Sequence, residues 1–162
     1  MRNAFTLVEV LLVVIILGIL AALVMPVVAD ASQGSKASAL KETLQTMRGQ
    51  CQMYYTQHEG KAPGYPAEGT VATAELLKAQ LAAFTDAAGN AVEAGAGALG
   101  PYIYKWPINP INGKDDVTIV GDGAPLPEAA SDGAGWIYQA STMTFRSDAV
   151  GQDAAGRDYY DY

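Results

Sequence analysis

The sequence predicts an α+β fold in which one long N-terminal helix packs against a small antiparallel-sheet head. Three observations predict it. An aliphatic run fills residues 10–29, an amphipathic helical stripe follows over residues 40–54, and short runs with strand character lie at residues 117–120 and 136–146. At 162 residues, the chain has room for one domain beyond the apolar run.

The apolar run is long enough to span a bilayer, which takes roughly 20 apolar residues. An ordinary membrane anchor or a secretory signal peptide would also contain such a run, and the letters VADA at 28–31 form a passable cleavage pattern. Glu9 argues against a plain anchor, because a carboxylate in the hydrocarbon core costs about 2.5–3.5 kcal/mol. Charges at such depth are usually paired or functional.

A cut between Ala4 and Phe5 would give Glu9 a partner. The new α-amino group would lie four residues before Glu9, and residues at that spacing share a helix face. The amine could also reach the glutamate of a neighbouring copy. A cationic terminus and a buried carboxylate would then neutralise each other between subunits.

Ala4 followed by FTLVE at 5–9 and an aliphatic run resembles the prepilin signature of type IV pilins and of the pseudopilins of type II secretion. The resemblance implies that a membrane prepilin peptidase cuts before Phe5 and methylates the new amine, and that Glu9 guides assembly. The family usually has glycine before the cut, where this chain has Ala4. The helix-weakening pair of the family matches Gly18 and Pro26.

The same resemblance implies a pilin-like lollipop with residues 1–4 as leader and 5–29 as membrane-spanning and filament-core half-helix. Residues 30–60 would form the amphipathic half-helix, and 61–162 the head. The implied partners are other copies in a helical homopolymer, the prepilin peptidase, an inner-membrane assembly platform, minor pilins or pseudopilins, and membrane lipid. The subunit would cross the inner membrane once, then enter a periplasmic or cell-surface filament.

After the apolar run, one stripe of apolar side chains continues the helix to about residue 58. Gly60, Pro63 and Pro66 end the pattern. We expect Cys51 to pack as a small hydrophobe, and His58 to lie on the exposed helix end. The stripe comprises Leu40, Leu44, Met47, Cys51 and Tyr54.

In the head, Thr73 can cap a second helix with Glu75 in its first turn. Residues 86–100 are rich in Gly and Ala and predict a loop, VTIV at 117–120 predicts a strand, and 136–146 predicts a hairpin. The apolar side chains expected to face the first helix are Leu76, Leu77, Leu81 and Phe84.

Two segments extend the resemblance into the head. GPYIYKWPINP at 100–110 and GWIYQASTMTFRSD at 135–148 resemble the head of the type II major pseudopilin. The single cysteine, Cys51, excludes an internal disulfide. Many major type IV pilins close a C-terminal loop with a disulfide. The lack of a disulfide therefore makes this chain less similar to those pilins.

Composition and motifs argue against other function classes. The net charge of −7 makes nucleic acid an unexpected direct partner. GAGALG at 95–100 matches a dinucleotide-binding pattern, but no strand precedes it and Pro101 follows it. No catalytic constellation is visible, so we expect a structural subunit, not a membrane-anchored enzyme.

One metal hypothesis remains open. Four aspartates lie in Gly-rich loops around the 117–120 strand, and calcium binds carboxylate and carbonyl oxygens on such loops. Type II major pseudopilins, which the chain resembles, bind calcium in the corresponding region. The alternative is that these carboxylates only solvate a loop, so we expect no cofactor to be required, with calcium as the candidate. The four are Asp115, Asp116, Asp122 and Asp132.

The C-terminal tail DAAGRDYYDY at 153–162 has two interpretations: a frayed end, or a subunit contact, since tyrosine is enriched at interfaces. For the whole protein, a type II secretion pseudopilus is the first interpretation and a type IV pilus for adhesion, motility or DNA uptake is the alternative.

Overall fold

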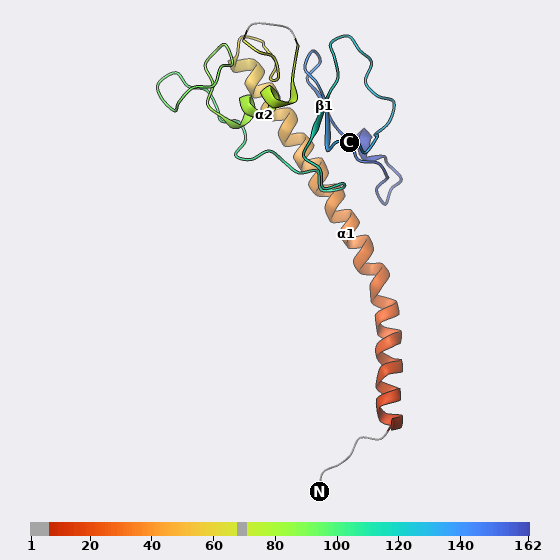
Figure 1. Ribbon diagram of the computed structural model, residues 1–162. Coiled ribbons are helices and arrows are strands. Elements are labelled where there is room, and N and C mark those ends of the chain that lie inside the picture. The colour runs from red at the N-terminus through yellow and green to blue at the C-terminus, as the bar shows by residue number, and fades with distance from the viewer. Residues whose placement is uncertain (1–6, 68–70) are drawn as a thin grey trace.

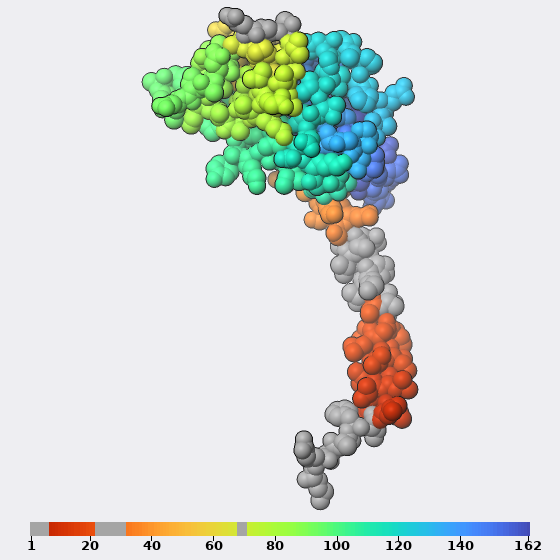
Figure 2. Space-filling view, viewed as in Figure 1, coloured from red at the N-terminus to blue at the C-terminus, as the bar shows by residue number. Residues whose placement is uncertain are grey.

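The helix α1 (Leu7–Gln57) is a rod whose C-terminal half carries all the other elements of the fold. The computed structural model describes residues 7–67 and 71–162, apart from the side chains of residues 22–31. Figure 2 shows the segment Leu7–Ala21 standing clear of the head. The α+β class and the long N-terminal helix are confirmed.

The head-bearing half of α1 is amphipathic, as predicted. The five residues of the predicted stripe are at most 1% exposed, and they face the head. Beyond Gln57 the backbone turns at Glu59 and Gly60, both with positive φ, and the Gly60 N–H closes the helix end by donating to the Tyr55 carbonyl oxygen.

Within the described residues, no helix meets the length and apolarity needed to cross a membrane.

The second helix, α2 (Ala74–Ala82), begins as its sequence predicts. The Thr73 hydroxyl accepts a hydrogen bond from the Leu76 N–H at 3.2 Å, which satisfies one of the free donors of the first turn. Leu77 and Leu81 are fully buried, whereas Leu76 and Phe84 are only partly buried. The buried face of α2 is therefore narrower than we expected.

The sheet consists of β1 (Val117–Ile119), β2 (Trp136–Gln139) and β3 (Thr144–Ser147), in the order β1-β2-β3. β2 and β3 form the predicted antiparallel hairpin, but β1 pairs with β2 in parallel. The prediction of an antiparallel sheet was therefore wrong, and the sheet is mixed. The connection over residues 120–135 is long enough to carry the chain back to the start of β1, which a parallel pair requires.

The core lies between the sheet and α1. All four residues of β2 are buried, and Phe145 of β3 packs against Trp136 and Tyr138 with ring centroids 5.4 and 6.0 Å apart. β3 is the strand that contacts α1, and it also contacts a C-terminal 3₁₀ turn, η1 (Tyr159–Asp161). The sheet is thereby fixed to the helix along its β3 side.

His58 is not on an exposed helix end, so that expectation was wrong. It is 1% exposed, stacks on Tyr54 with ring centroids 3.6 Å apart, and makes hydrogen bonds with the Tyr54 carbonyl and the Thr85 hydroxyl. The loop after α2 folds over the end of α1 and covers the ring, a tertiary contact that helical periodicity does not reveal.

Candidate assembly site

The N-terminal part of α1 presents apolar side chains to its surroundings on every face. Each large apolar residue between Leu7 and Leu20 is at least 48% exposed. A helix that is apolar all round is stable only when other apolar surface covers it. In an isolated copy of this chain, the apolar surface of α1 between Leu7 and Leu20 is therefore uncovered, and we expect lipid or neighbouring helices to cover it.

Glu9 lies in the first turn of α1 and is exposed. A carboxylate there is favoured by the positive end of the helix dipole. Ala4 and Phe5 lie outside the described residues, so the predicted contact between the Phe5 amine and Glu9 stays a prediction.

Gly18 and Pro26 lie within α1, whose helical backbone is continuous through both positions. A β-carbon added at Gly18 would meet no atom within 4 Å, so this glycine is not needed for packing within one chain. The side chain of Pro26 lies outside the described part. Loss of helicity around this pair in a filament stays a prediction.

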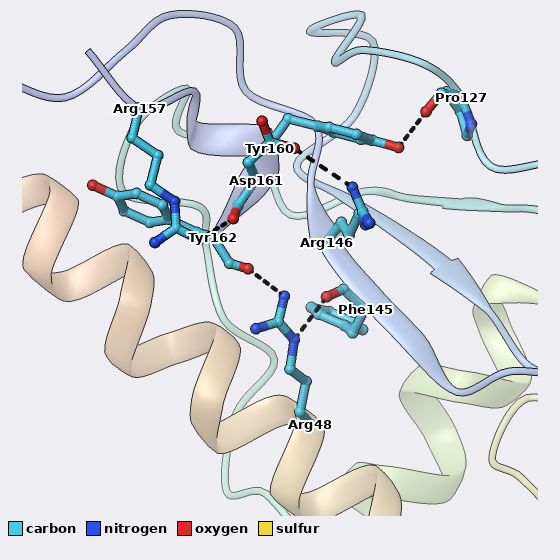
Figure 3. A network of polar contacts seen from close by, with 8 residues as sticks. All are labelled: Arg48, Pro127, Phe145, Arg146, Arg157, Tyr160, Asp161 and Tyr162. Atoms are coloured by element: carbon cyan, nitrogen blue, oxygen red, sulfur yellow. Dashed lines mark hydrogen bonds and ion pairs between the residues drawn. The ribbon is translucent and has the colours of Figure 1, made fainter. Parts of the chain in front are cut away.

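Arg48 ties α1 to both the sheet and the C-terminal tail (Figure 3). Its Nε donates to the Phe145 carbonyl oxygen at 3.0 Å, and its Nη2 donates to the Tyr162 main-chain oxygen at 2.6 Å. Partial burial lowers the pKa of Arg48, and the positive charges of Arg146 and Arg157 lower it further.

The tail is held by arginine–aromatic contacts. Arg146 lies over the Tyr160 ring at 4.7 Å, and Arg157 lies over the Tyr162 ring at 4.8 Å. Tyr160 also donates to the Pro127 carbonyl. Tyr159 and Tyr160 are each 6% exposed, so the tail is part of the head and the frayed-end interpretation was wrong.

A pocket of about 380 Å³ opens between α1 and this tail. Three of its lining residues carry a positive charge. The Lys41 side chain makes no hydrogen bond or ion pair with any residue that the structure describes. The lining residues are Lys41, Gln45, Arg48, Arg157 and Tyr162, and we call this set the basic pocket.

The four aspartates of the calcium hypothesis are not gathered into one site. No group of three or more His, Cys, Asp or Glu side chains that could hold a metal ion exists among the described residues. Asp115 and Asp116 are exposed beside β1, and Asp122 accepts a hydrogen bond from the Tyr65 hydroxyl at 2.7 Å. Calcium binding stays a prediction, without a preformed set of acidic ligands.

Asp132 is held by donors from the protein itself. Its carboxylate accepts from the Asn112 side-chain amide at 2.8 Å, and its main-chain oxygen accepts from the Lys114 ammonium. A positive charge of the chain thus already lies at this loop.

Asp148 was missed by sequence reasoning. It is 1% exposed, and its carboxylate accepts hydrogen bonds from the Ser131 hydroxyl and from the N–H groups of Ser131 and Ala134. It fixes the end of the β1–β2 connection to the end of β3. Nothing in the sequence marks it, because its partners lie 14 and 17 residues away.

Cys51 packs as the sequence predicts. It is fully buried, and burial raises the pKa of its thiol to about 12. A thiol in this state is neutral and unreactive at physiological pH. The state of Cys51 does not test whether the chain is an enzyme, so the expectation that it is not one stays a prediction.

Comparison with known proteins bears on the first residues. Residues 1–25 match the family described as the prokaryotic N-terminal methylation motif. No curated protein and no solved structure matches the chain. The motif is the type IV pilin and pseudopilin signature, and it implies a pilin-like or pseudopilin subunit that is processed by a prepilin peptidase and assembles into a membrane-derived filament. It does not distinguish the two classes.

Proposed function

We propose that the chain is the subunit of a type II secretion pseudopilus, cut between Ala4 and Phe5 and polymerised through the N-terminal half of α1. One observation carries the proposal. The matched motif leads into a helix whose described side chains from Leu7 to Ala21 are all exposed and whose C-terminal half holds the head. Copies that pack their uncovered halves together would leave the heads on the outside of a filament.

In this proposal Glu9 supplies the specificity of subunit addition. Before assembly the residues 10–29 hold the subunit in the inner membrane, where the carboxylate is costly. In the filament it meets the amine of Phe5 on an adjacent subunit. Removing either member of a buried ion pair strands the other, so the contact rejects a subunit that lacks its partner charge.

Two features favour the pseudopilus over a surface pilus. The one cysteine is buried in the α1 stripe, so the head is held by packing and by the Arg48 contacts in place of a disulfide. The Trp- and Tyr-containing hairpin of β2 and β3 is one of the two head segments that resemble the type II major pseudopilin. The alternative is a major pilin of a type IV pilus. The neighbouring genes would distinguish the two functions. Genes for an outer-membrane secretin and further pseudopilins would indicate a pseudopilus, whereas genes for a retraction motor and minor pilins would indicate a type IV pilus.

Processing is the first test. Mass spectrometry of assembled protein should show a chain that begins at Phe5 with a methylated amine. A chain that still begins at Met1 in assembled material would refute the proposal.

The second test is Glu9→Leu, with Glu42→Leu as the matched control on the head-bearing half of α1. Membrane insertion of Glu9→Leu should persist or improve, since leucine inserts more easily than a charged residue. Cleavage should also persist, because the scissile bond is unchanged. Filaments should be lost when this variant is the sole copy and return in part when unaltered subunits are mixed in, whereas Glu42→Leu should assemble.

Electron microscopy of sheared cells measures filament formation, and an immunoblot of the membrane fraction measures insertion. Normal filaments from Glu9→Leu alone would show that Glu9 is not the assembly contact.

A further inference from the structure

The turn at residues 131–135, where the β1–β2 connection ends, presents oxygen atoms to the segment 109–114. The Asp132 carboxylate and the main-chain oxygens of Asp132, Ala134 and Gly135 all accept hydrogen bonds from side chains of that segment. Calcium binds such carboxylate and carbonyl oxygens on flexible loops. At this turn the calcium hypothesis can therefore be compared with the contacts that the chain itself makes.

The donors that face these oxygens come from the protein. The Lys114 ammonium donates to the Asp132 main-chain oxygen. The Asn112 amide donates to the Asp132 carboxylate at 2.8 Å and to the Ala134 oxygen at 2.9 Å. A calcium ion at the Asp132 main-chain oxygen would first have to displace the ammonium, because two cations in contact repel each other. The donor set of this turn therefore does not fit a metal ion.

The main chain that carries the ammonium is fixed against the turn. The Lys114 N–H donates to the Asn112 side-chain oxygen at 3.1 Å, and the Lys114 carbonyl oxygen accepts from the Asn109 N–H at 2.9 Å. A β-carbon added at Gly135 would lie 2.2 Å from that carbonyl oxygen, so the two backbones are in direct contact. Lys114 is also partly buried. The fold thus sets the position of the ammonium.

The carboxylates at the turn indicate why a positive charge is useful there. The buried Asp148 carboxylate accepts from neutral donors of Ser131 and Ala134, and the Asp132 carboxylate accepts from a neutral amide. Neither carboxylate forms an ion pair with a described residue. In the described part of the chain, Lys114 is the only cation that donates a hydrogen bond to this turn. Its charge offsets part of the cost of burying the carboxylates.

We propose that the Lys114 ammonium takes the place of a metal ion at the turn 131–135, so that the head holds the end of its β1–β2 connection without calcium. The ammonium supplies the positive charge, and Asn112 and Asn109 supply the remaining donors. This inference goes beyond the filament function, and it applies equally to a pseudopilin and to a pilin. It is the alternative to the calcium hypothesis.

Thermal unfolding of the full-length chain in detergent gives the first readout. Lys114→Met keeps an unbranched apolar stem and removes the charge, and it should lower the melting temperature by at least about 4 °C. Lys114→Arg keeps the charge and should lose less than half as much. Lys105→Met is the matched control, because Lys105 is exposed and its side chain makes no hydrogen bond or ion pair with a described residue. An unaffected Lys114→Met, or an arginine variant as unstable as the methionine variant, would overturn the proposal.

Terbium luminescence gives the second readout. Terbium binds the oxygen ligands of calcium and emits when an excited tryptophan lies close by, and Trp136 directly follows the turn. The signal that counts is emission that calcium displaces and that Asp132→Asn abolishes. The unaltered chain and Lys114→Arg should lack it, and a chelator should leave their melting temperatures unchanged. Lys114→Met should show it, and calcium should raise the melting temperature of this variant.

The outcomes decide between the ammonium and the metal. This emission from the unaltered chain, or a fall in its melting temperature with a chelator, would show that calcium holds the turn and would overturn the proposal. If Lys114→Met binds no metal and gains no stability from calcium, the ammonium is only a hydrogen-bond donor, and the proposal also fails. Should Lys114→Met not fold, the unaltered chain and Lys114→Arg decide alone, because both must be indifferent to calcium.

Discussion

Asn109 offers a quantitative test of how the head is held together. The side chain is fully buried, and it joins three segments. Its Nδ2 donates to the Gly135 carbonyl oxygen at 2.7 Å and to the Ser147 hydroxyl at 2.9 Å, and its Oδ1 accepts from the Ile111 N–H at 2.9 Å. The substitution Asn109→Ala removes all three bonds at once and adds none.

The expected loss follows from the partners left behind. The Gly135 carbonyl keeps its bond from the Asp148 N–H and the Ser147 hydroxyl keeps its bond from the Ala149 N–H, so each buried partner loses one of two hydrogen bonds, at about 0.5–1.5 kcal/mol per bond. The Ile111 N–H is only partly buried and adds less. We expect Asn109→Ala to lower the free energy of unfolding by roughly 2–4 kcal/mol, a substantial part of the 5–15 kcal/mol typical of a domain.

Urea unfolding of the full chain in detergent, followed by the fluorescence of the buried Trp136, measures this loss. Asn90→Ala is the control, because Asn90 is exposed and its side chain bonds, among the described residues, only to the partly exposed Asp86. The control should change the free energy of unfolding by less than about 0.5 kcal/mol. A loss below about 1 kcal/mol for Asn109→Ala would refute the assigned role.

Three further predictions concern the core and the loops. Tyr54→Phe should leave stability unchanged or raise it in thermal unfolding, because the buried Tyr54 hydroxyl has no hydrogen-bond partner among the described residues; a marked loss would reveal a missing partner. Burial raises the pKa of the Cys51 thiol above its value in the unfolded chain, so the neutral thiol stabilises the fold below about pH 9 and this stabilisation is lost as the pH rises towards 12; in urea unfolding at different pH, the free energy of unfolding of Cys51→Ala should fall less over that range than that of the unaltered chain. If the loops of Asp115, Asp116, Asp122 and Asp132 bind calcium, a chelator should lower the melting temperature, because calcium at a hundredfold excess over its dissociation constant adds about 2.7 kcal/mol; an unchanged melting temperature would refute the calcium hypothesis.

Local patterns in the sequence predicted what local physics decides. The α1 stripe, the Thr73 cap and the β2–β3 hairpin each depend on residues a few positions apart, and each is confirmed. The motif at residues 1–25 is likewise contiguous.

Features set by distant contacts were not predictable. The parallel pairing of β1 depends on the path of residues 120–135, and the burial of His58 depends on Thr85, 27 residues away. The helical pattern of the sequence places Arg48 on the polar face of α1 and does not distinguish it from the other polar residues there. Its importance comes from Phe145 and Tyr162, at separations of 97 and 114 residues, which no periodicity encodes.

Those two separations bear on the order in which a new subunit takes shape. α1 leaves the ribosome first, and the segment that clasps it through Arg48 leaves last. At about 5–20 residues per second, the residues after Gln57 take on the order of 5–20 s to synthesise. During that interval the stripe from Leu40 to Tyr54 lacks the sheet that will bury it. A nascent subunit therefore needs shielding of this stripe before its last residues arrive, and slower translation lengthens the time at risk.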